Sequence, residues 1–366
     1  MKIPYVNLDK QSREEKNELV KIFKKVLSSG EYVGGQYIKD FENKISKFCN
    51  VKYCISLNSG TDALTLALHA LGVRRGDEVI TTPNSFIAST SVIVHLGAKP
   101  VFVDVLNDQC MNPDLIESKI TNKTKVIMPV HLTGRMCNMY KIKEIAKKYK
   151  LKIVEDSAQA IGSKYKGIMS GAWGDIGCFS AHPLKNLNAI GDSGFLTTNS
   201  KKIYKYINDL KNHGMTNRNI VRNFGYVSRM DNLQAAILNF RFLKLKKIIR
   251  TRRENASLYK RFIKTKKVFI PENKSEEFNT FHTFVIQAPN RNGLKKFLKK
   301  KKVETSIHYP IPIHLQPASK FLNYKKGDFP ETEKQSKRIL TLPINQFLKV
   351  DQIKYISKLV NDFYKK

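Results

Sequence analysis

Three segments of the chain carry side chains that could do chemistry, and each follows an apolar stretch that is predicted to be a β-strand. Ligands of open α/β sheets bind beyond the carboxyl ends of the strands, so a site is expected at such positions. The first segment, 58–64, offers small residues, hydroxyl groups and the free N–H groups of a helix start, which suit a phosphate. A plain capped turn, with Thr61 or Asp62 as the N-cap, explains the same residues equally well.

The second segment places two acids, Glu155 and Asp156, at the end of the apolar stretch 151–154. A carboxylate buried there costs free energy unless it meets a cation. Asp156 is therefore a candidate to face a cation on a ligand, such as a protonated ring nitrogen. The alternative is that it only caps the helix start.

The third segment places Ser180 and Lys185 after a short apolar strand, just before Gly-Asp-Ser-Gly at 191–194. Taken alone, a lysine in so basic a chain is usually a surface residue. Together, a phosphate-binding turn, a strand-end aspartate and a Ser-x-x-x-x-Lys sequence are the parts that pyridoxal phosphate (PLP) requires. The lysine amine forms an imine with the cofactor, the carboxylate keeps the pyridine nitrogen protonated, and amides and hydroxyls anchor the phosphate.

The elements that must position these residues alternate between strand and helix patterns over the first 200 residues. Strands are predicted at 51–57, 78–81, 100–105, 125–130 and 151–154, and helices at 61–71, 85–96 and 140–149. Strands joined by helix-length crossovers indicate a largely parallel sheet covered on both faces, which is an α/β fold.

Beyond residue 200 helical patterns dominate before the alternation resumes. Helices are predicted at 204–212, 231–249, 251–264, 292–302 and 350–364, and strands near 281–287 and 303–307. A length of 366 residues favours more than one structural part. We therefore predict a large cofactor-binding domain over 1–245, with an N-terminal arm, and a smaller C-terminal α+β domain over 246–366.

Seven motifs lie along nearly the whole chain: Ser29-Gly30-x-Tyr32-Val33-x-Gly35, Ser59-Gly60-Thr61-Asp62-Ala63-Leu64, Glu155-Asp156-x-Ala158-Gln159-Ala160-x-Gly162, Phe179-Ser180-x-His182-Pro183-x-Lys185-Asn186-Leu187, Gly191-Asp192-x-Gly194, Ser228-Arg229-Met230-Asp231-x-Leu233-Gln234-Ala235-Ala236 and Ile307-His308-Tyr309-Pro310-Ile311-Pro312-x-His314. Together they resemble the sugar aminotransferases of the DegT/StrS type. The resemblance implies the aspartate-aminotransferase fold, fold type I of the PLP-dependent enzymes. It also implies a homodimer with active sites at the subunit interface.

The resemblance further implies roles for individual residues. Lys185 would form the imine with PLP and shuttle a proton between the substrate carbon and the cofactor, and Asp156 would pair with the pyridinium nitrogen. Five other residues would hold the cofactor: Phe86 stacked on the ring, Gln159 near the ring oxygen, and Gly60, Thr61 and Ser180 at the phosphate. Three residues resemble the positions that meet the sugar: His308, Tyr309 and His314. Core packing stays open as the alternative for Phe86, and purely structural roles stay open for the two histidines.

Two positions depart from the family pattern. Where the family commonly has Asn reaching from the neighbouring subunit to the phosphate, this chain has Val227, whose side chain cannot donate a hydrogen bond. Asn188 stands where many relatives have Gly just past the lysine loop. Lys185 is retained, whereas the dehydratase branch of the family has His there, so transamination is expected.

The resemblance implies amino transfer from L-glutamate to a keto-sugar, most simply a nucleotide-linked 3-keto or 4-keto deoxyhexose, for surface polysaccharide, lipopolysaccharide or glycoconjugate biosynthesis. An eight- or nine-carbon acidic keto-sugar is the alternative within the family. An alternative from a different functional class is a DNA-associated regulatory protein built on the same fold. The basic composition of the chain motivates this alternative.

The charge balance is unusual, because 65 Lys and Arg against 31 Asp and Glu give a net charge of +34. Such a field attracts anions generally, but no separate DNA-binding element is evident, so we expect no specific nucleic-acid partner. Five cysteines without a C-x-x-C pair predict neither a disulfide framework nor a metal site. With no predicted membrane span or leader sequence, a cytoplasmic location is expected.

Overall fold

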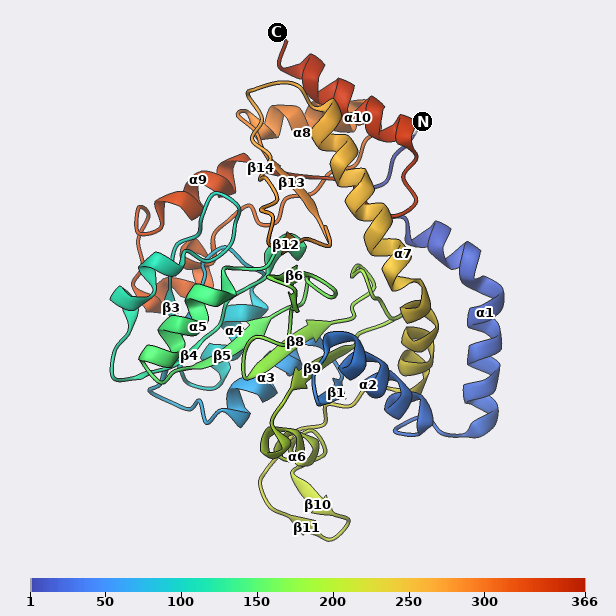
Figure 1. The fold of residues 1–366 in the computed structure, drawn as a ribbon, viewed down its shortest axis with the longest axis vertical. Coiled ribbons are helices and arrows are strands. Elements are labelled where there is room, and N and C mark those ends of the chain that lie inside the picture. The colour runs from blue at the N-terminus through green and yellow to red at the C-terminus, as the bar shows by residue number, and fades with distance from the viewer. Residues whose placement is uncertain (1, 366) are drawn as a thin grey trace.

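A seven-stranded mixed sheet forms the centre of the computed structural model, which describes residues 2–365 (Figure 1). Its strands lie in the order β1 (Tyr53–Leu57), β9 (Gly194–Thr198), β8 (Ile176–Ser180), β5 (Lys152–Asp156), β4 (Thr124–Ile127), β2 (Glu78–Thr81) and β3 (Lys99–Phe102). β9 runs antiparallel to both of its neighbours, and the other neighbouring pairs are parallel. The predicted α/β fold with a largely parallel sheet is confirmed.

Helices cover both faces of this sheet. On one face lie α3 (Gly60–Ala70), α4 (Ala88–His95) and α6 (Lys201–Leu210), and on the other lie α2 (Gln36–Cys49), α5 (Met139–Lys148) and α7 (Asn232–Phe262). Consecutive strand residues therefore enter different cores: Val154 packs with the α3 side and Ile153 with the α5 side. This alternation fixes where the residues that follow them on β5 can point.

A second hydrophobic core lies above the sheet in Figure 1. It packs α8 (Arg291–Lys300), α10 (Val350–Phe363) and the antiparallel pair β13 (Phe284–Gln287) and β14 (Ile339–Leu342) against the C-terminal half of α7. The N-terminus joins this core through Ile3, whose N–H donates to the Lys302 carbonyl at 2.9 Å. From there α1 (Leu8–Ser29) returns alongside α7 (Figure 1).

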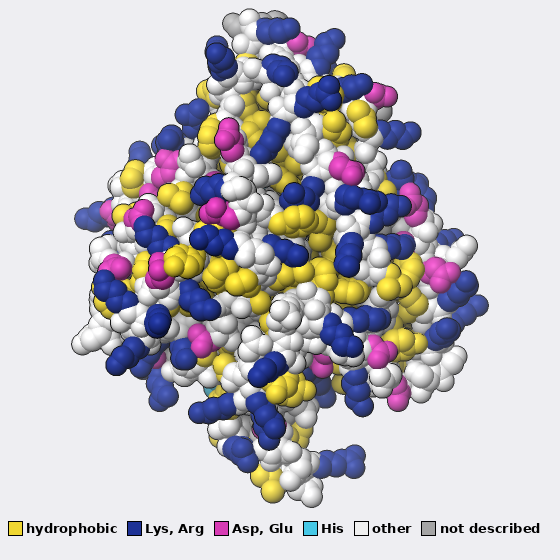
Figure 2. All heavy atoms as spheres, viewed as in Figure 1, with side chains coloured by type: hydrophobic (Ala, Val, Ile, Leu, Met, Phe, Trp, Pro, Cys, Tyr) yellow, Lys and Arg dark blue, Asp and Glu magenta, His cyan; other side chains and the backbone are white. Residues whose placement is uncertain are grey.

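Smaller elements complete the chain. They are α9 (Pro330–Arg338), the three-stranded sheet β12 (Glu277–Phe278), β6 (Lys164–Tyr165) and β7 (Ile168–Met169), and the projecting hairpin β10 (Met215–Asn217) and β11 (Ile220–Val221). None of the helices within residues 2–365 has the length and apolar character needed to cross a membrane. Figure 2 shows Lys and Arg scattered over the whole visible face, with no single basic patch.

Two details of the sequence-based prediction are wrong. The separate helices expected at 231–249 and 251–264 form the single 31-residue helix α7, because no Gly or Pro interrupts 249–252. The strand expected near 303–307 is reduced to isolated bridges, Ile3 with Val303 and Ser306 with Thr341. The expected domain boundary at 245 falls inside α7, and the division into two domains remains a prediction.

Candidate active site

A cavity of about 420 Å³ opens at the carboxyl ends of β5 and β8. Residues at the carboxyl end of the central sheet line one side, and His282, His308 and Tyr309 from the C-terminal part of the chain also contribute to the lining. Nine predicted site residues line it: Gly60, Thr61, Phe86, Asp156, Gln159, Ser180, Lys185, His308 and Tyr309. The structure thus brings together residues that lie up to 249 positions apart in the chain.

The start of α3 forms one end of the cavity. Ser59 is its N-cap, since the Ser59 side chain accepts a hydrogen bond from the Asp62 N–H, so neither Thr61 nor Asp62 serves as the cap. Gly60 allows a close approach, because a Cβ there would lie 2.7 Å from the Ser180 Cβ. The first amides of α3 and the Ser180 hydroxyl are therefore held side by side, as a phosphate site requires.

Asp156 lies on the same face of β5 as Val154 and points into the cavity. Its carboxylate accepts hydrogen bonds from the Ser89 hydroxyl at 2.7 Å and from the Ala158 N–H at 3.2 Å. Burial raises the pKa of Asp156, and these hydrogen bonds together with the charge of Lys185 act against that rise. The carboxylate is thus fixed in orientation and faces a cationic group.

Lys185 lies in the loop after β8, and its N–H donates to the His182 carbonyl at 2.8 Å. Burial lowers the pKa of the Lys185 amine to about 8, although Asp156 pulls it upward. Asn188 closes this loop, because its Nδ2 donates to the Pro183 carbonyl at 2.7 Å. The departure at Asn188 therefore adds a hydrogen bond that a glycine cannot make.

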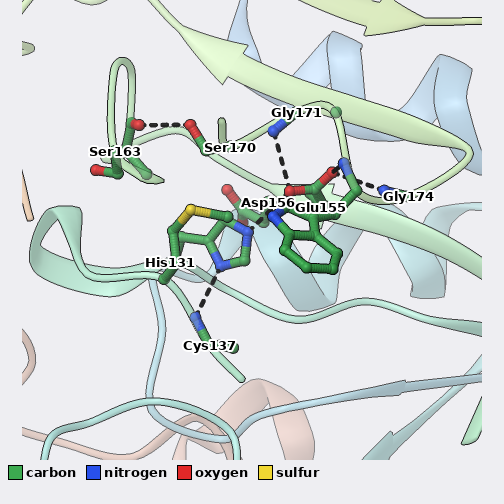
Figure 3. A network of polar contacts seen from close by, with 12 residues as sticks. His131, Cys137, Glu155, Asp156, Ser163, Ser170, Gly171 and Gly174 are labelled. Atoms are coloured by element: carbon green, nitrogen blue, oxygen red, sulfur yellow. Dashed lines mark hydrogen bonds and ion pairs between the residues drawn. The ribbon is translucent and has the colours of Figure 1, made fainter. Parts of the chain in front are cut away.

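Glu155, the neighbour of Asp156, points to the opposite face of the sheet (Figure 3). Its fully buried carboxylate accepts hydrogen bonds from the N–H groups of Gly171, Trp173 and Gly174 at 2.8 to 2.9 Å. Only the second acid of the pair thus reaches the cavity, and the first one anchors the loop that enters β8.

His131 connects these two faces. Its Nδ1 accepts the Cys137 N–H at 3.3 Å, and its Nε2 lies 3.1 Å from the Glu155 carboxylate, so Nε2 carries a proton and donates a hydrogen bond to Glu155 (Figure 3). The ring also lines the cavity beside Asp156. Sequence reasoning missed His131, although its position four residues after β4 follows the same strand-end rule.

The ring-side residues are held by contacts between distant segments. The side-chain Oε1 of Gln159 accepts a hydrogen bond from the Thr133 N–H at 2.8 Å. The Tyr309 ring lies 5.9 Å from the Phe86 ring, which is 55% exposed in the single chain. His308 contacts the Thr341 hydroxyl at 3.0 Å, and burial together with the charge of Lys185 lowers its pKa to about 4. Phe86 is therefore not a core residue.

His314 does not line the cavity, contrary to the sequence-based expectation. Its ring is buried against Phe329, and its Nε2 lies 3.1 Å from the Glu333 carboxylate. It lies in the short helical turn Ile313–Leu315, whose Ile313 packs in a small core with Phe102 and Phe329. The contacts that the structure shows for His314 are thus with Phe329 and Glu333 and not with the cavity.

The residues present fit PLP. The cavity holds an amine of lowered pKa and an oriented carboxylate, together with an aromatic face and an open helix N-terminus. The Ser193 hydroxyl, which lines the same cavity, is buried without a hydrogen-bond partner among the described residues. A buried hydroxyl without a partner is costly, and a phosphate oxygen would satisfy it.

Val227 lies near the phosphate end and is 57% exposed. The adjacent Ser228 hydroxyl donates to the Asp62 carboxylate at 2.7 Å, which ties this segment to the start of α3. The side chain that replaces the family's usual Asn is therefore apolar and open on the surface of the chain.

Comparisons with known proteins agree with this geometry. A sequence model of the DegT/DnrJ/EryC1/StrS aminotransferase family matches residues 13–361. A dTDP-3-amino-3,6-dideoxy-alpha-D-galactopyranose transaminase of Aneurinibacillus thermoaerophilus is 38% identical over 364 residues, with 99% of each chain covered. A pleiotropic regulatory protein of Geobacillus stearothermophilus is 38% identical over 372 residues, covering 100% of this chain and 99% of its own. The crystal structure of S. venezuelae DesV in complex with a ketimine intermediate matches with a TM-score of 0.97 and 32% identity, over 100% of this chain and 99% of that one.

Proposed function

The chain belongs to the DegT/DnrJ/EryC1/StrS aminotransferase family and is a PLP-dependent sugar aminotransferase, and we propose that it moves an amino group from L-glutamate to a nucleotide-linked 3-keto or 4-keto deoxyhexose. The observation that carries the proposal is the pairing of Lys185 and Asp156 in one buried cavity. We further propose that the amino sugar serves surface polysaccharide, lipopolysaccharide or glycoconjugate biosynthesis.

The chain's own residues supply binding, orientation and proton transfer. When bound, PLP supplies an electron sink for the substrate carbon that loses its proton. Asp156 would hold a positive charge on the ring nitrogen, and the start of α3, Ser180 and Ser193 would hold the phosphate. A lysine with a pKa near 8 is partly neutral at physiological pH, so Lys185 Nζ can accept the substrate proton and return it.

The charge of the cavity favours an uncharged sugar ring over an acidic one. Among the lining residues that the structure describes, the lysine and carboxylate side chains are Lys185, Asp156 and Asp192, and none is an arginine. Lys185 and Asp156 are committed to the cofactor, so the cavity wall offers no arginine to a sugar carboxylate. We therefore place the eight- or nine-carbon acidic keto-sugar second.

We also propose that two copies of the chain share their active sites. Large apolar side chains are exposed around the cavity: Phe86, Ile87, Leu184, Ile190 and Val227 are each 41 to 57% exposed. Exposed apolar side chains that gather in one place indicate an interface. A second chain would bury them and close the cavity to water.

The test is the visible absorption of the purified protein with PLP, before and after L-glutamate. A yellow protein that bleaches with glutamate supports the proposal, and Lys185→Ala should abolish turnover while the fold, followed by circular dichroism, stays intact. Lys201→Ala, on the surface of α6, is the matched control. Turnover retained in Lys185→Ala would refute the assignment.

A regulatory binding function is the second candidate, favoured by the name of the Geobacillus stearothermophilus relative and by the net charge of +34. Sequence-specific DNA binding in a gel shift at physiological salt would support it. Bleaching by glutamate with no such binding would decide for the enzyme.

A further inference from the structure

His282 brings a fourth imidazole to the cavity from the C-terminal part of the chain, between β12 and β13. Its backbone is fixed on several sides. Arg252 donates to the His282 carbonyl at 3.0 Å, the Thr283 N–H donates to the Thr133 carbonyl at 3.4 Å, and the Thr280 N–H donates to the Gly134 carbonyl at 3.0 Å. The backbone that carries the imidazole is therefore tied to α7 and to the segment that follows β4.

The nitrogens of His282 differ from those of the other cavity histidines. His131 uses both ring nitrogens, on Glu155 and on the Cys137 N–H, while His308 uses Nδ1 on a threonine hydroxyl. His182 Nδ1 accepts the Leu184 N–H. In the described residues, His282 Nδ1 is enclosed without a hydrogen-bond partner, and Nε2 has no hydrogen bond but is open to the cavity.

The protonation state of His282 follows from these surroundings. Burial, with a smaller contribution from the charge of Lys185, holds its pKa well below the usual value, so the ring is neutral at physiological pH. A buried N–H without a partner is more costly than a buried acceptor. The single proton therefore belongs on Nε2, and His282 presents an uncharged N–H donor to the cavity.

We propose that His282 Nε2–H donates a hydrogen bond to an uncharged oxygen of the acceptor sugar, and that it is a specificity-determining residue for the sugar half of the reaction. This inference rests on the proposed function. An uncharged donor suits a hydroxyl or carbonyl oxygen, whereas the carboxylates of L-glutamate call for charged partners. A site built to hydrogen-bond a substrate oxygen discriminates strongly against analogues that lack it.

The two half-reactions can be measured separately from the absorbance of the bound cofactor. L-Glutamate tests one amino donor, and dTDP-3-amino-3,6-dideoxy-D-galactose tests the sugar half in reverse. His282→Leu should lower kcat/KM for the amino sugar by about 10- to 100-fold, while the glutamate value stays within about threefold. His282→Gln places an amide near the lost Nε2–H and should recover most of the sugar activity, whereas His282→Asn reaches only the Nδ1 position and should not.

Binding to the PLP-free protein gives a readout independent of turnover. His282→Leu should raise the dissociation constant of the same amino sugar, measured by calorimetry, about tenfold. His95→Gln, on the exposed end of α4, is the control and should change neither measurement. Circular dichroism identifies a variant that fails to fold. If His282→Leu does not fold, the comparison of folded His282→Gln with folded His282→Asn still tests whether a donor at the Nε2 position is needed.

The outcomes separate the two proposals. If the wild-type protein with PLP reacts with neither glutamate nor the amino sugar, the proposed function fails and this inference fails with it. If the wild type reacts with both and His282→Leu loses both half-reactions equally, or neither, the assignment of His282 alone is overturned. Equal recovery by Gln and Asn would also overturn it.

Discussion

The two faces of the sheet at its carboxyl edge differ in what their carboxylates do. On the cavity face, Asp156 accepts hydrogen bonds but faces a lysine amine and space for a ligand. On the opposite face, Glu155 is satisfied by three backbone N–H groups and His131. Two adjacent acids of the same strand thus serve chemistry and stability respectively, and the pleat of the strand decides which is which.

The cavity face should respond to mutation through activity. Asp156→Asn keeps the size and the hydrogen bond from Ser89 but removes the negative charge. We expect turnover to fall by roughly 10²-fold or more, the scale of removing one preorganised electrostatic contact. The unfolding midpoint in urea should change little, because burial already disfavours the charge of Asp156. Unchanged turnover would show that the carboxylate does not act on the cofactor.

The opposite face should respond through stability. Glu155→Gln replaces one acceptor oxygen by an NH₂ group that confronts backbone N–H donors of the 171–174 loop. We expect the free energy of unfolding to drop by about 3 kcal/mol, since buried donors lose their partners. Urea denaturation measures the drop, and the protein that remains folded should still turn yellow with PLP. A large loss of turnover per folded molecule, without loss of stability, would break the distinction between the faces.

The charge on the cavity face also predicts a pH dependence. The Lys185 amine must be neutral to add to the PLP aldehyde, and its pKa is about 8 rather than 10.5. The rate of PLP capture by the PLP-free protein should therefore fall about tenfold per pH unit below 8 and level off above it. Stopped-flow absorbance measures this rate, with Nα-acetyl-lysine correcting for titration of PLP itself.

Asp156 sharpens this test because its charge raises the Lys185 pKa. In Asp156→Asn the break in the pH profile should move to lower pH. A wild-type break near 10.5 would mean that the amine is solvated and that the cavity does not tune it.

The sequence predicted the cofactor side of the site better than the substrate side. Asp156 and Lys185 follow strands, so the hydrophobic pattern that indicates the strands also locates them. His282 was missed because its place depends on contacts between distant segments, such as the hydrogen bond from Arg252 in α7 to the His282 carbonyl. His131 was overlooked although it follows β4 and the strand-end rule applies to it. His314 was misplaced because a motif cannot show that a helical turn carries its last residue into a separate core.

The phosphate end of the cavity belongs to neither face and gives the smallest expected effect. Val227 is 57% exposed beside Ser228, which is bonded to the start of α3, so an amide at position 227 could supplement the phosphate contacts across the proposed dimer. Val227→Asn should tighten PLP binding about fivefold, the worth of one hydrogen bond of about 1 kcal/mol. Absorbance titration of the PLP-free protein measures this, and Val227→Leu is the control with no donor. If Asn binds PLP no more tightly than Leu, position 227 does not reach the phosphate, and the α3 amides with Ser180 and Ser193 suffice to hold it.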